Sequence, residues 1–230
     1  MSLKTDLLAL AAYVAYGPLP DFWRHVLRRG VYCRGNRASP QVSLTFDDGP
    51  DPRYTPLILE ALARRQVKAT FFLVGQRVLR YPELVRDILA GGHEIGNHTF
   101  HHRPAWLLPP WVSRSEILEG ERIIRQVAGT APLFFRPPWG LFNLSTTLSL
   151  GTRPVLWSIH GYDWRRRSTP AKIARRIVER SRPGFIILLH DAGGAPGAPW
   201  NTCQALPLIL DGLAEKGLHP VALSRLLPRG

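Results

Sequence analysis

The fold is decided by the stretch Val42-Ser-Leu-Thr-Phe-Asp47-Asp48-Gly-Pro50, in which a short apolar run ends in two carboxylates. The run is rich in β-formers and the Gly-Pro pair is typical of a turn, so the pattern predicts a strand that stops at the two aspartates. Because side chains alternate along a strand, Asp47 and Asp48 are expected to point in different directions. One carboxylate can then bind a metal while the other handles a proton, without the mutual repulsion of two carboxylates in one pocket.

From Gln41 onward, strand-like and helix-like segments alternate with short connections. Apolar runs typical of strands lie at 42–46, 69–74, 93–97, 133–135, 155–159, 185–189 and 217–223. Helical periodicity is present at 54–65, 82–90, 113–127, 170–180 and 204–216, and Ser113 to Glu116 has the pattern of a capping box. About seven such units without a Gly-x-Gly-x-x-Gly turn favour an α/β fold with a parallel barrel over a dinucleotide-binding sheet. In such barrels the chemistry collects at the C-terminal ends of the strands.

The composition suits one large globular domain with a strongly basic surface. The chain has 230 residues, 45% of them hydrophobic, and its 30 Lys and Arg against 17 Asp and Glu give a formal net charge of +13. Such a charge favours anionic partners: nucleic acid, acidic lipid headgroups or an anionic cell-wall polymer. No nucleic-acid recognition motif accompanies the charge, so a nucleic-acid partner is not expected. The spacing of Cys33 and Cys203 indicates no zinc ribbon and leaves both a single disulfide and free thiols open.

The N-terminal segment, residues 1–38, is expected to lie outside a catalytic domain formed by residues 39–230. Its apolar run from Leu7 to Tyr16 is shorter than the ~20 residues that span a bilayer. A signal-like segment, an interfacial helix and a helix packed on the barrel all remain open. The interfacial helix is suggested by a mixed apolar and basic continuation: Phe22, Trp23, Val26 and Leu27 with Arg24, Arg28 and Arg29. Residues 1–30 are therefore a candidate for peripheral membrane contact.

A histidine cluster, Asn97-His98-Thr-Phe-His101-His102, follows the third predicted strand. On a helical turn, a spacing of four residues would put the rings of His98 and His102 on one side. Two imidazoles and one carboxylate can hold a divalent metal and leave coordination positions open for water. His101, three residues from His98, is a rival partner that the spacing does not exclude.

Further polar side chains follow three later strands. Arg136 comes directly after the fourth strand and precedes two prolines, and its permanent charge can pair with a carboxylate and keep it ionised. Asp163 and Trp164 lie beyond the fifth predicted strand, and His190 directly follows the sixth. We expect these side chains to gather with Asp47 at the C-terminal ends of the strands.

Together these residues resemble one family, the polysaccharide deacetylases with a NodB-homology domain, known as carbohydrate esterase family 4. Five motifs carry the resemblance: Thr45-Phe-Asp-Asp-Gly-Pro50, His98-Thr-x-x-His102, Arg136-Pro-Pro-Trp-Gly140, Asp163-Trp164 and Leu188-Leu-His190. They occur in the family's order and rough spacing, and the resemblance covers about residues 41–227. Five separate motifs are far more specific than any single pattern. The resemblance implies a distorted (β/α) barrel with an N-terminal helical extension and the metal-dependent hydrolysis of N-acetyl groups on amino sugars.

The resemblance also implies a role for each motif residue. Asp48, His98 and His102 match the family's metal ligands, for which zinc or cobalt is the usual ion. Asp47 matches the general base, and Arg136 the cation that orients it.

The remaining motif residues match the acid and the walls of the acetyl pocket. His190 matches the general acid that protonates the departing amine, with Asp163 tuning its pKa. The backbone around Trp139 matches an oxyanion donor. The substrate-binding residues implied in this way are Pro138, Trp139, Trp164 and Leu188.

This sequence departs from the family pattern at three positions. Arg103 follows His102 where many relatives have proline, and Trp139 stands where many have tyrosine. His160 occupies a position three residues before Asp163 that is often aspartate, which leaves open how the acid is wired.

The substrate follows only loosely from the sequence. Relatives process peptidoglycan, chitin oligomers, acetylated xylan and lipid-linked amino sugars. The basic composition favours an anionic cell-wall glycan such as peptidoglycan, and a monomer in the cell envelope is expected. A deacetylase or deformylase of a lipid-linked amino sugar, a small-molecule amidohydrolase and a carbohydrate-binding pseudo-enzyme are the alternatives. The joint presence of Asp47, Asp48, His98, His102 and His190 argues against the pseudo-enzyme.

Overall fold

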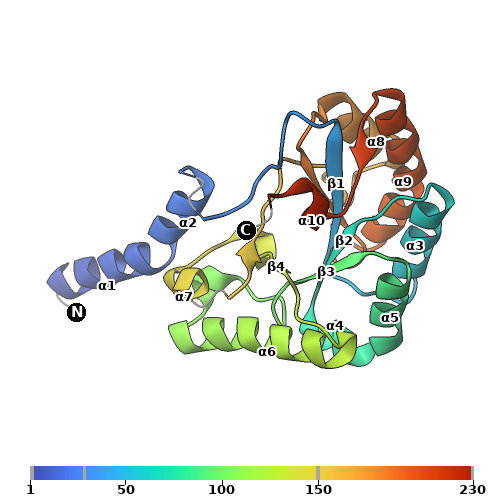
Figure 1. Ribbon diagram of the computed structural model, residues 1–230. Coiled ribbons are helices and arrows are strands. Elements are labelled where there is room, and N and C mark those ends of the chain that lie inside the picture. The colour runs from blue at the N-terminus through green and yellow to red at the C-terminus, as the bar shows by residue number, and fades with distance from the viewer. Residues whose placement is uncertain (1–2, 28–29, 149–150, 229–230) are drawn as a thin grey trace.

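The protein is built around a curved parallel β-sheet, and helices pack outside it (Figure 1). The computed structural model describes residues 3–27, 30–148 and 151–228. Its strands are β1 Gln41–Asp47, β2 Thr70–Leu73, β3 Glu94–Asn97, β4 Phe134–Phe135, β5 Arg153–Pro154, β6 Ile159–His160, β7 Ile186–His190 and β8 His219–Pro220.

The strands follow the order β5-β4-β3-β2-β1-β7-β6, and β8 also pairs with β1. Every pairing between these strands is parallel. Within the described residues the outer strands β5 and β6 do not pair with each other, so the barrel is incomplete. This arrangement confirms the predicted distorted barrel of about seven parallel strands.

Strand β1 lies at the centre of the sheet because nearly all of it can be buried. Six of its seven residues, from Val42 to Asp47, are buried. The register places Asp47 beside His190 of β7 and Phe72 of β2. Because all strands run in one direction, their C-terminal ends meet at the same edge of the sheet, and the polar residues that follow them gather there.

Helices cover the outer face of the sheet and close the hydrophobic core. Phe46 of β1 and Phe71 of β2 stack within this core, with ring centroids 5.0 Å apart. The helices after β1 are α3 Thr55–Arg64, α4 Gly75–Arg80, α5 Pro82–Ala90, α6 Pro110–Ala128, α7 Leu144–Leu148, α8 Pro170–Arg180, α9 Ala198–Glu215 and α10 Leu223–Leu226.

The predicted capping box is wrong. Helix α6 begins at Pro110, so Ser113 lies inside its first turn and donates to the side chain of Asn143 at 3.3 Å. Glu116 accepts hydrogen bonds from His101 of the loop after β3. Proline at the first helical position can start the helix three residues earlier, which frees both polar side chains for contacts with other segments.

Three other predicted elements also differ. The strand predicted at 217–223 is reduced to β8, and Leu223 is the first residue of α10. The predicted strand at 155–159 is mostly irregular, because the backbone there bonds to strand β4 and to Tyr32. The strands of this region are β5 before it and β6 at its end. Helix α9 starts at Ala198 rather than 204 and contains Pro207. Short strands and a proline inside a helix are the places where a local pattern predicts least.

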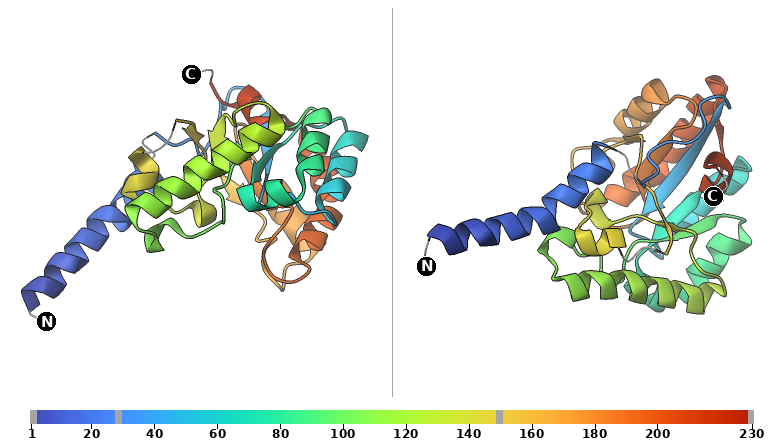
Figure 2. Two further views of the ribbon diagram at one scale, coloured as in Figure 1. Left: turned by 90° about the horizontal axis from the view of Figure 1, so that it is seen from below. Right: turned by 60° about the vertical axis from the view of Figure 1, so that its left-hand side comes forward.

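Two helices precede the sheet, α1 Leu3–Tyr16 and α2 Pro18–His25. Helix α1 projects away from the rest of the protein in all views, whereas α2 runs back toward the body (Figures 1 and 2). Tyr16 ties the end of α1 to the body, because its hydroxyl donates to the carbonyl of Leu108 at 3.0 Å. A helix packed along the barrel, one of the three predicted alternatives, is therefore wrong for α1.

The connection from α2 to β1 runs close to the sheet. Tyr32 forms a parallel bridge with Val155, and Arg34 an antiparallel bridge with Phe185. Among the described residues, no helix has the length and apolar character needed to cross a membrane. Arg28 and Arg29 of the predicted basic continuation lie outside the described residues, and the division of the chain at residue 38 stays a prediction.

Candidate active site

A pocket of about 400 Å³ lies at the C-terminal ends of the strands. Its wall contains eight of the residues predicted for the site: Asp47, Asp48, His98, His102, Trp139, Trp164, Leu188 and His190. Three further residues of the wall were not predicted: Trp157, Gly193 and Gly194. Arg136 and Asp163 are fully buried behind this wall, where they bind Asp47 and His190. Pro138 is buried as well and is not among the described residues of the wall.

Asp48, His98 and His102 form a three-donor group suited to a metal ion. Their ligand atoms lie within 4.8 Å of one another. Asp48 Oδ1 is 2.9 Å from His102 Nε2 and 3.4 Å from His98 Nε2. Two ligands of a tetrahedral ion with bonds of about 2.1 Å stand about 3.4 Å apart, so this spacing fits one divalent ion.

The two histidines lie on a loop, so the predicted helical turn is wrong. The backbone of Thr99 and His102 is left-handed, with φ of 66° and 59°, and the N–H of His102 donates to Thr99 Oγ1 at 3.2 Å. Asp48 is left-handed too, with φ of 75°. This rare conformation turns the Asp48 carboxylate away from the direction of the strand, and the surrounding structure has to hold it there. The spacing therefore identified two rings that do lie together beside Asp48, but for the wrong geometric reason.

Hydrogen bonding and charge prepare these donors for a cation. His98 Nδ1 lies 2.6 Å from the carbonyl oxygen of Arg136. Because a carbonyl only accepts, Nδ1 carries the hydrogen, and a neutral ring keeps its Nε2 lone pair for a metal. Burial alone would raise the pKa of Asp48, but the imidazoles of His102 and His98 hold it well below its usual range. One ionised carboxylate and two imidazoles are a donor set that divalent transition metals prefer.

His101 belongs to a different contact. Its backbone N–H and its Nδ1 each lie 2.7 Å from a carboxylate oxygen of Glu116, which is buried on α6. Arg103 approaches the same carboxylate at 3.9 Å. The ring of His101 is therefore held by α6, and the geometry of the described residues favours His102 over this rival.

Asp47 and Arg136 form a buried ion pair beside the three-donor group. Arg136 Nη1 donates to Asp47 Oδ1 at 2.6 Å. The same guanidinium donates to the hydroxyl of Thr45 at 2.8 Å and to the backbone carbonyls of Val155 and Leu156. A permanent cation with this many bonds inside the protein supplies a fixed positive charge at the Asp47 carboxylate.

His190 ends β7, and Asp163 holds it at two points. One oxygen of Asp163 accepts the backbone N–H of His190 at 2.7 Å and the Thr202 hydroxyl at 2.9 Å, and the other lies 3.1 Å from His190 Nδ1. Burial alone would lower the pKa of His190, but Asp163, with smaller contributions from Asp48 and Asp47, raises it to about 9. The ring is therefore protonated at neutral pH and can donate a proton into the pocket.

An apolar part of the wall lies next to His190. It contains Leu188 and Trp164, and the Trp164 ring centroid is 5.3 Å from that of His190. His160 packs on Trp164 at 5.0 Å. Burial, with the nearby charge of Arg176, lowers the pKa of His160 to about 4. His160 is thus a neutral ring that packs on Trp164, whereas Asp163 is the carboxylate bonded to His190.

Trp139 stands on a tight loop after β4. Its backbone is left-handed, with φ of 55°, and its exposed ring lies 4.4 Å from the ring of His102. Gly140 follows with φ of 74°, and a side chain there would meet Trp157 at 2.9 Å. The Trp157 ring therefore leaves no room for a side chain at Gly140, and it also lines the pocket. No sequence motif indicated Trp157.

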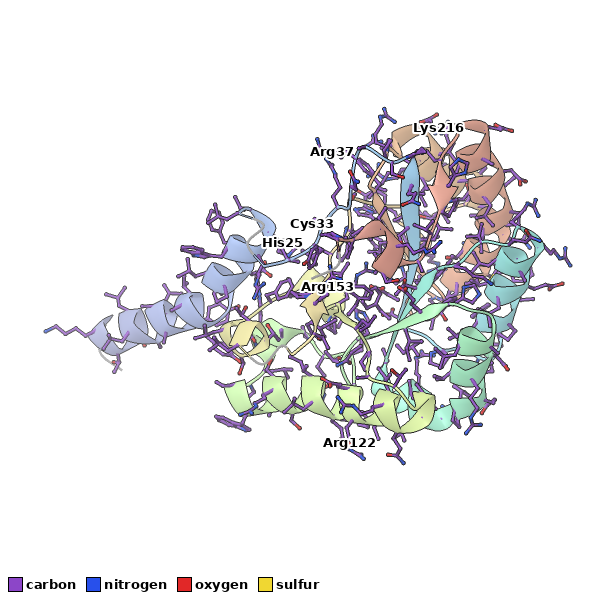
Figure 3. All side chains as sticks on the ribbon, viewed as in Figure 1. His25, Cys33, Arg37, Arg122, Arg153 and Lys216 are labelled. Atoms are coloured by element: carbon purple, nitrogen blue, oxygen red, sulfur yellow. The ribbon has the colours of Figure 1, made fainter. Side chains whose placement is uncertain are left out.

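Helix α2 is hydrogen-bonded to this same loop. Asp21 Oδ1 accepts the backbone N–H of Phe142 at 2.7 Å, and His25 Nε2 lies 2.8 Å from the carbonyl oxygen of Gly140. Figure 3 shows His25 where α2 meets the body of the protein. Trp106 Nε1 also donates to the Phe142 carbonyl at 3.0 Å. We call Asp21 and His25 the α2 latch. Sequence reasoning missed it because the partners lie more than 100 residues apart, and no local pattern reports such a contact.

A second support that sequence reasoning missed lies behind Asp48. Asp191 is fully buried and accepts the Thr55 hydroxyl at 2.6 Å, and a side chain on Gly49 would collide with it at 2.2 Å. Gly193 has φ of 68°, and a side chain there would meet Asp48 Oδ2 at 2.2 Å. The only signal in the sequence was the Gly193-Gly194 pair after β7, which suggests close backbone approach.

Comparison with known proteins agrees with this geometry. The family model described as polysaccharide deacetylase matches residues 34–155. This chain belongs to the polysaccharide deacetylase family. A peptidoglycan-N-acetylglucosamine deacetylase from Bacillus cereus is 39% identical over 191 residues, which cover 81% of this chain and 87% of that protein. A chitooligosaccharide deacetylase from Sinorhizobium fredii is 36% identical over 212 residues, which cover 90% of this chain and 91% of that protein.

The fold is shared with solved members of the family. The crystal structure of the Bc1960 peptidoglycan N-acetylglucosamine deacetylase superposes with a TM-score of 0.81 at 33% identity, covering 90% of this chain and 95% of that one. These comparisons confirm the predicted family and the class of enzyme, a deacetylase. The family is generally metal-dependent, in keeping with the three-donor group of Asp48, His98 and His102. The roles of individual residues stay predictions.

The two candidate histidines allow a matched test of the metal group. We expect His102→Ala to weaken zinc binding by more than about 100-fold, because it removes one of three ligands. His101→Ala should leave the affinity within about twofold, because the His101 ring binds Glu116. Isothermal titration of the metal-stripped variants measures both values. Weak binding by His101→Ala with normal binding by His102→Ala would exchange the two assignments.

The α2 latch predicts that Asp21 positions the Trp139 loop. We expect Asp21→Ala to lower kcat for acetate release roughly tenfold with little change in KM, because a catalytic loop displaced by a fraction of an ångström loses alignment. Asp21→Asn keeps an oxygen that can accept the Phe142 N–H and should restore kcat. A role limited to stability would instead lower Tm and leave kcat of the folded fraction unchanged, which would contradict the positioning role.

Proposed function

We propose that this protein is a metal-dependent deacetylase that removes N-acetyl groups from the glucosamine units of peptidoglycan. The observation that carries the proposal is a single pocket that contains a three-donor metal group, a carboxylate paired with a buried arginine, and a histidine whose pKa is about 9. Amide hydrolysis needs an activated water, a stabilised oxyanion and a proton for a poor leaving group. The three features of the pocket can supply these requirements.

The metal would be one zinc or cobalt ion held by Asp48, His98 and His102. When bound, it supplies Lewis-acid activation of a water molecule and of the acetyl carbonyl. Two imidazoles and one carboxylate leave further coordination positions for these groups.

The protein's own residues carry the proton transfers. Asp47 accepts a proton from the water that attacks the acetyl carbonyl carbon, and Arg136 orients the Asp47 carboxylate. A backbone N–H of the Trp139 loop donates to the oxyanion. His190 gives its proton to the amide nitrogen as the carbon–nitrogen bond breaks, which releases acetate and a free amine. Asp163 holds the His190 ring in place and in its protonated form.

The walls of the pocket would select the acetyl group and the sugar. Trp164 and Leu188 form the apolar surface for the acetyl methyl group. The exposed ring of Trp139 offers a stacking surface for a sugar ring, and the buried Pro138 fixes the loop beneath it.

Charge and relatives support peptidoglycan as the substrate. Similar proteins are named as deacetylases of peptidoglycan and of chitooligosaccharides. A net charge of +13 favours the anionic polymer over a neutral one. We therefore propose that this protein acts in the cell envelope.

Acetate release by metal-stripped protein, before and after addition of zinc or cobalt, tests the proposal. We expect metal to restore release from both an N-acetylglucosamine oligomer and peptidoglycan. Asp47→Asn should bind metal normally but lose at least about 100-fold in turnover, because it lacks the general base. Only release from peptidoglycan should fall as salt rises.

Two results would contradict this scheme. Normal metal binding without acetate release from either substrate would remove the deacetylase assignment. Loss of metal in Asp47→Asn would show that Asp47 and Asp48 have exchanged roles.

The His190–Asp163 pair predicts the alkaline side of the pH profile. His190 is active when protonated, so kcat should fall as pH rises through its pKa, which is about 9. A bound cation offsets the charge of Asp48 and would therefore lower this pKa. Asp163→Asn removes the carboxylate that raises this pKa, so the fall should move to lower pH. Thr202→Val keeps the carboxylate and should move it much less. An unchanged alkaline limb in Asp163→Asn would show that His190 is not the acid.

A further inference from the structure

Helix α1 is rich in apolar residues and is exposed along most of its described length. Every residue from Lys4 to Ala15 is exposed. Its leucines lie on several sides, and Leu8 is 70% exposed and Leu10 58%. Figure 3 shows the side chains of α1 standing out around the helix. A helix that is apolar all round is normally surrounded by protein or by lipid.

The apolar surface continues along α2 and onto α7. Phe22, Val26 and Leu27 are exposed on and after α2. On α7, Leu144 and Leu148 are exposed, the latter by 76%. A groove of about 580 Å³ joins the two parts and is lined in part by Leu19, Trp23 and Leu144. We call the described residues 3–27 together with α7 the apolar arm. Exposed apolar side chains that gather on neighbouring elements around a groove are typical of an interaction surface.

Basic residues accompany the apolar arm. Residues 1–29, which contain the N-terminal part of the arm and the two arginines that follow it in the sequence, have four Lys and Arg against two Asp. One of the two aspartates, Asp21, is engaged in the α2 latch. Cations near an anionic membrane surface add electrostatic attraction to the burial of apolar side chains.

We propose that the apolar arm docks this protein onto a lipid bilayer that carries anionic headgroups. The described part of helix α1 has 14 residues, so it is about 21 Å long and shorter than the roughly 30 Å hydrocarbon core. This part of the helix enters one leaflet. The α2 latch bonds the arm to the Trp139 loop, so the active-site pocket is held in a fixed relation to the membrane surface.

The arrangement favours lipid over a second copy of this chain. A partner helix covers one face of α1, whereas its exposed leucines point in several directions and need an environment that surrounds the helix. Each copy also carries a formal net charge of +13, which opposes the pairing of two copies.

Sedimentation with lipid vesicles tests the proposal on the full chain. We expect the protein to bind vesicles of phosphatidylglycerol and phosphatidylcholine more tightly than vesicles of phosphatidylcholine alone, with the difference shrinking as salt rises. Leu7→Glu/Leu10→Glu places two carboxylates on α1 and should lower the affinity at least tenfold. Leu208→Glu, at a position 51% exposed on α9, is the matched control and should bind as the unchanged protein does.

Acetate release from a soluble oligomer should be the same for all three proteins, which shows that the variants are folded. The vesicle assay needs no catalysis, so its outcome is independent of the proposed deacetylase activity. Absence of vesicle binding by the unchanged protein would overturn the proposal. So would a dimer in light scattering that the double variant converts to monomer, because a second copy would then cover the arm.

Discussion

The ion pair between Arg136 and Asp47 is the interaction on which the rest of the site depends. Arg136 is completely buried, its guanidinium carbon lies 4.1 Å from the ring centroid of Phe72, and it also donates to Thr45 and two backbone carbonyls. Removing one partner of a buried pair typically costs about 3–5 kcal/mol, because the other charge is left uncompensated. The pair thus joins β1, β2 and the segment after β5 around one charge. A carboxylate fixed in this way cannot turn away from the three-donor group beside it, so stability and catalytic geometry rest on the same contact.

The fold was largely predictable because its signal is local. Buried parallel strands read as apolar runs, and polar residues that end those runs must meet at one edge of the sheet. Asp47, Arg136 and His190 were therefore found from the sequence as neighbours. The boundaries that failed, at Ser113 and at 155–159, are places where side chains or backbone of another segment replace the local hydrogen bond. A local sequence pattern contains no information about hydrogen bonds to distant segments.

The site was predictable as a set of residues and less so as a geometry. Its backbone uses left-handed conformations at Asp48, Thr99, His102 and Trp139, which cost energy in non-glycine residues and leave no trace in composition. Space for them comes from Gly49 and Gly193, which allow Asp191 and Asp48 to approach the chain within distances that no side chain permits. The geometry likewise favours His102 over His101 only because a carboxylate on α6 binds the His101 ring. These choices depend on contacts between distant segments, so only the assembled structure contains them.

The exposed helix α1 needs a source of stability that contacts with the rest of the protein do not provide. An isolated helix of about 12–15 residues is marginal in water, and α1 gains almost no burial from the body of the protein. Its stability as a helix therefore needs a second medium, and an apolar, basic segment is best matched by an anionic membrane surface. Because α2 bonds directly to the Trp139 loop, ordering the arm on a membrane would also restrain that loop. If the substrate is a wall polymer, as proposed, docking on the membrane would also keep the enzyme close to that polymer and so raise the effective concentration of its substrate.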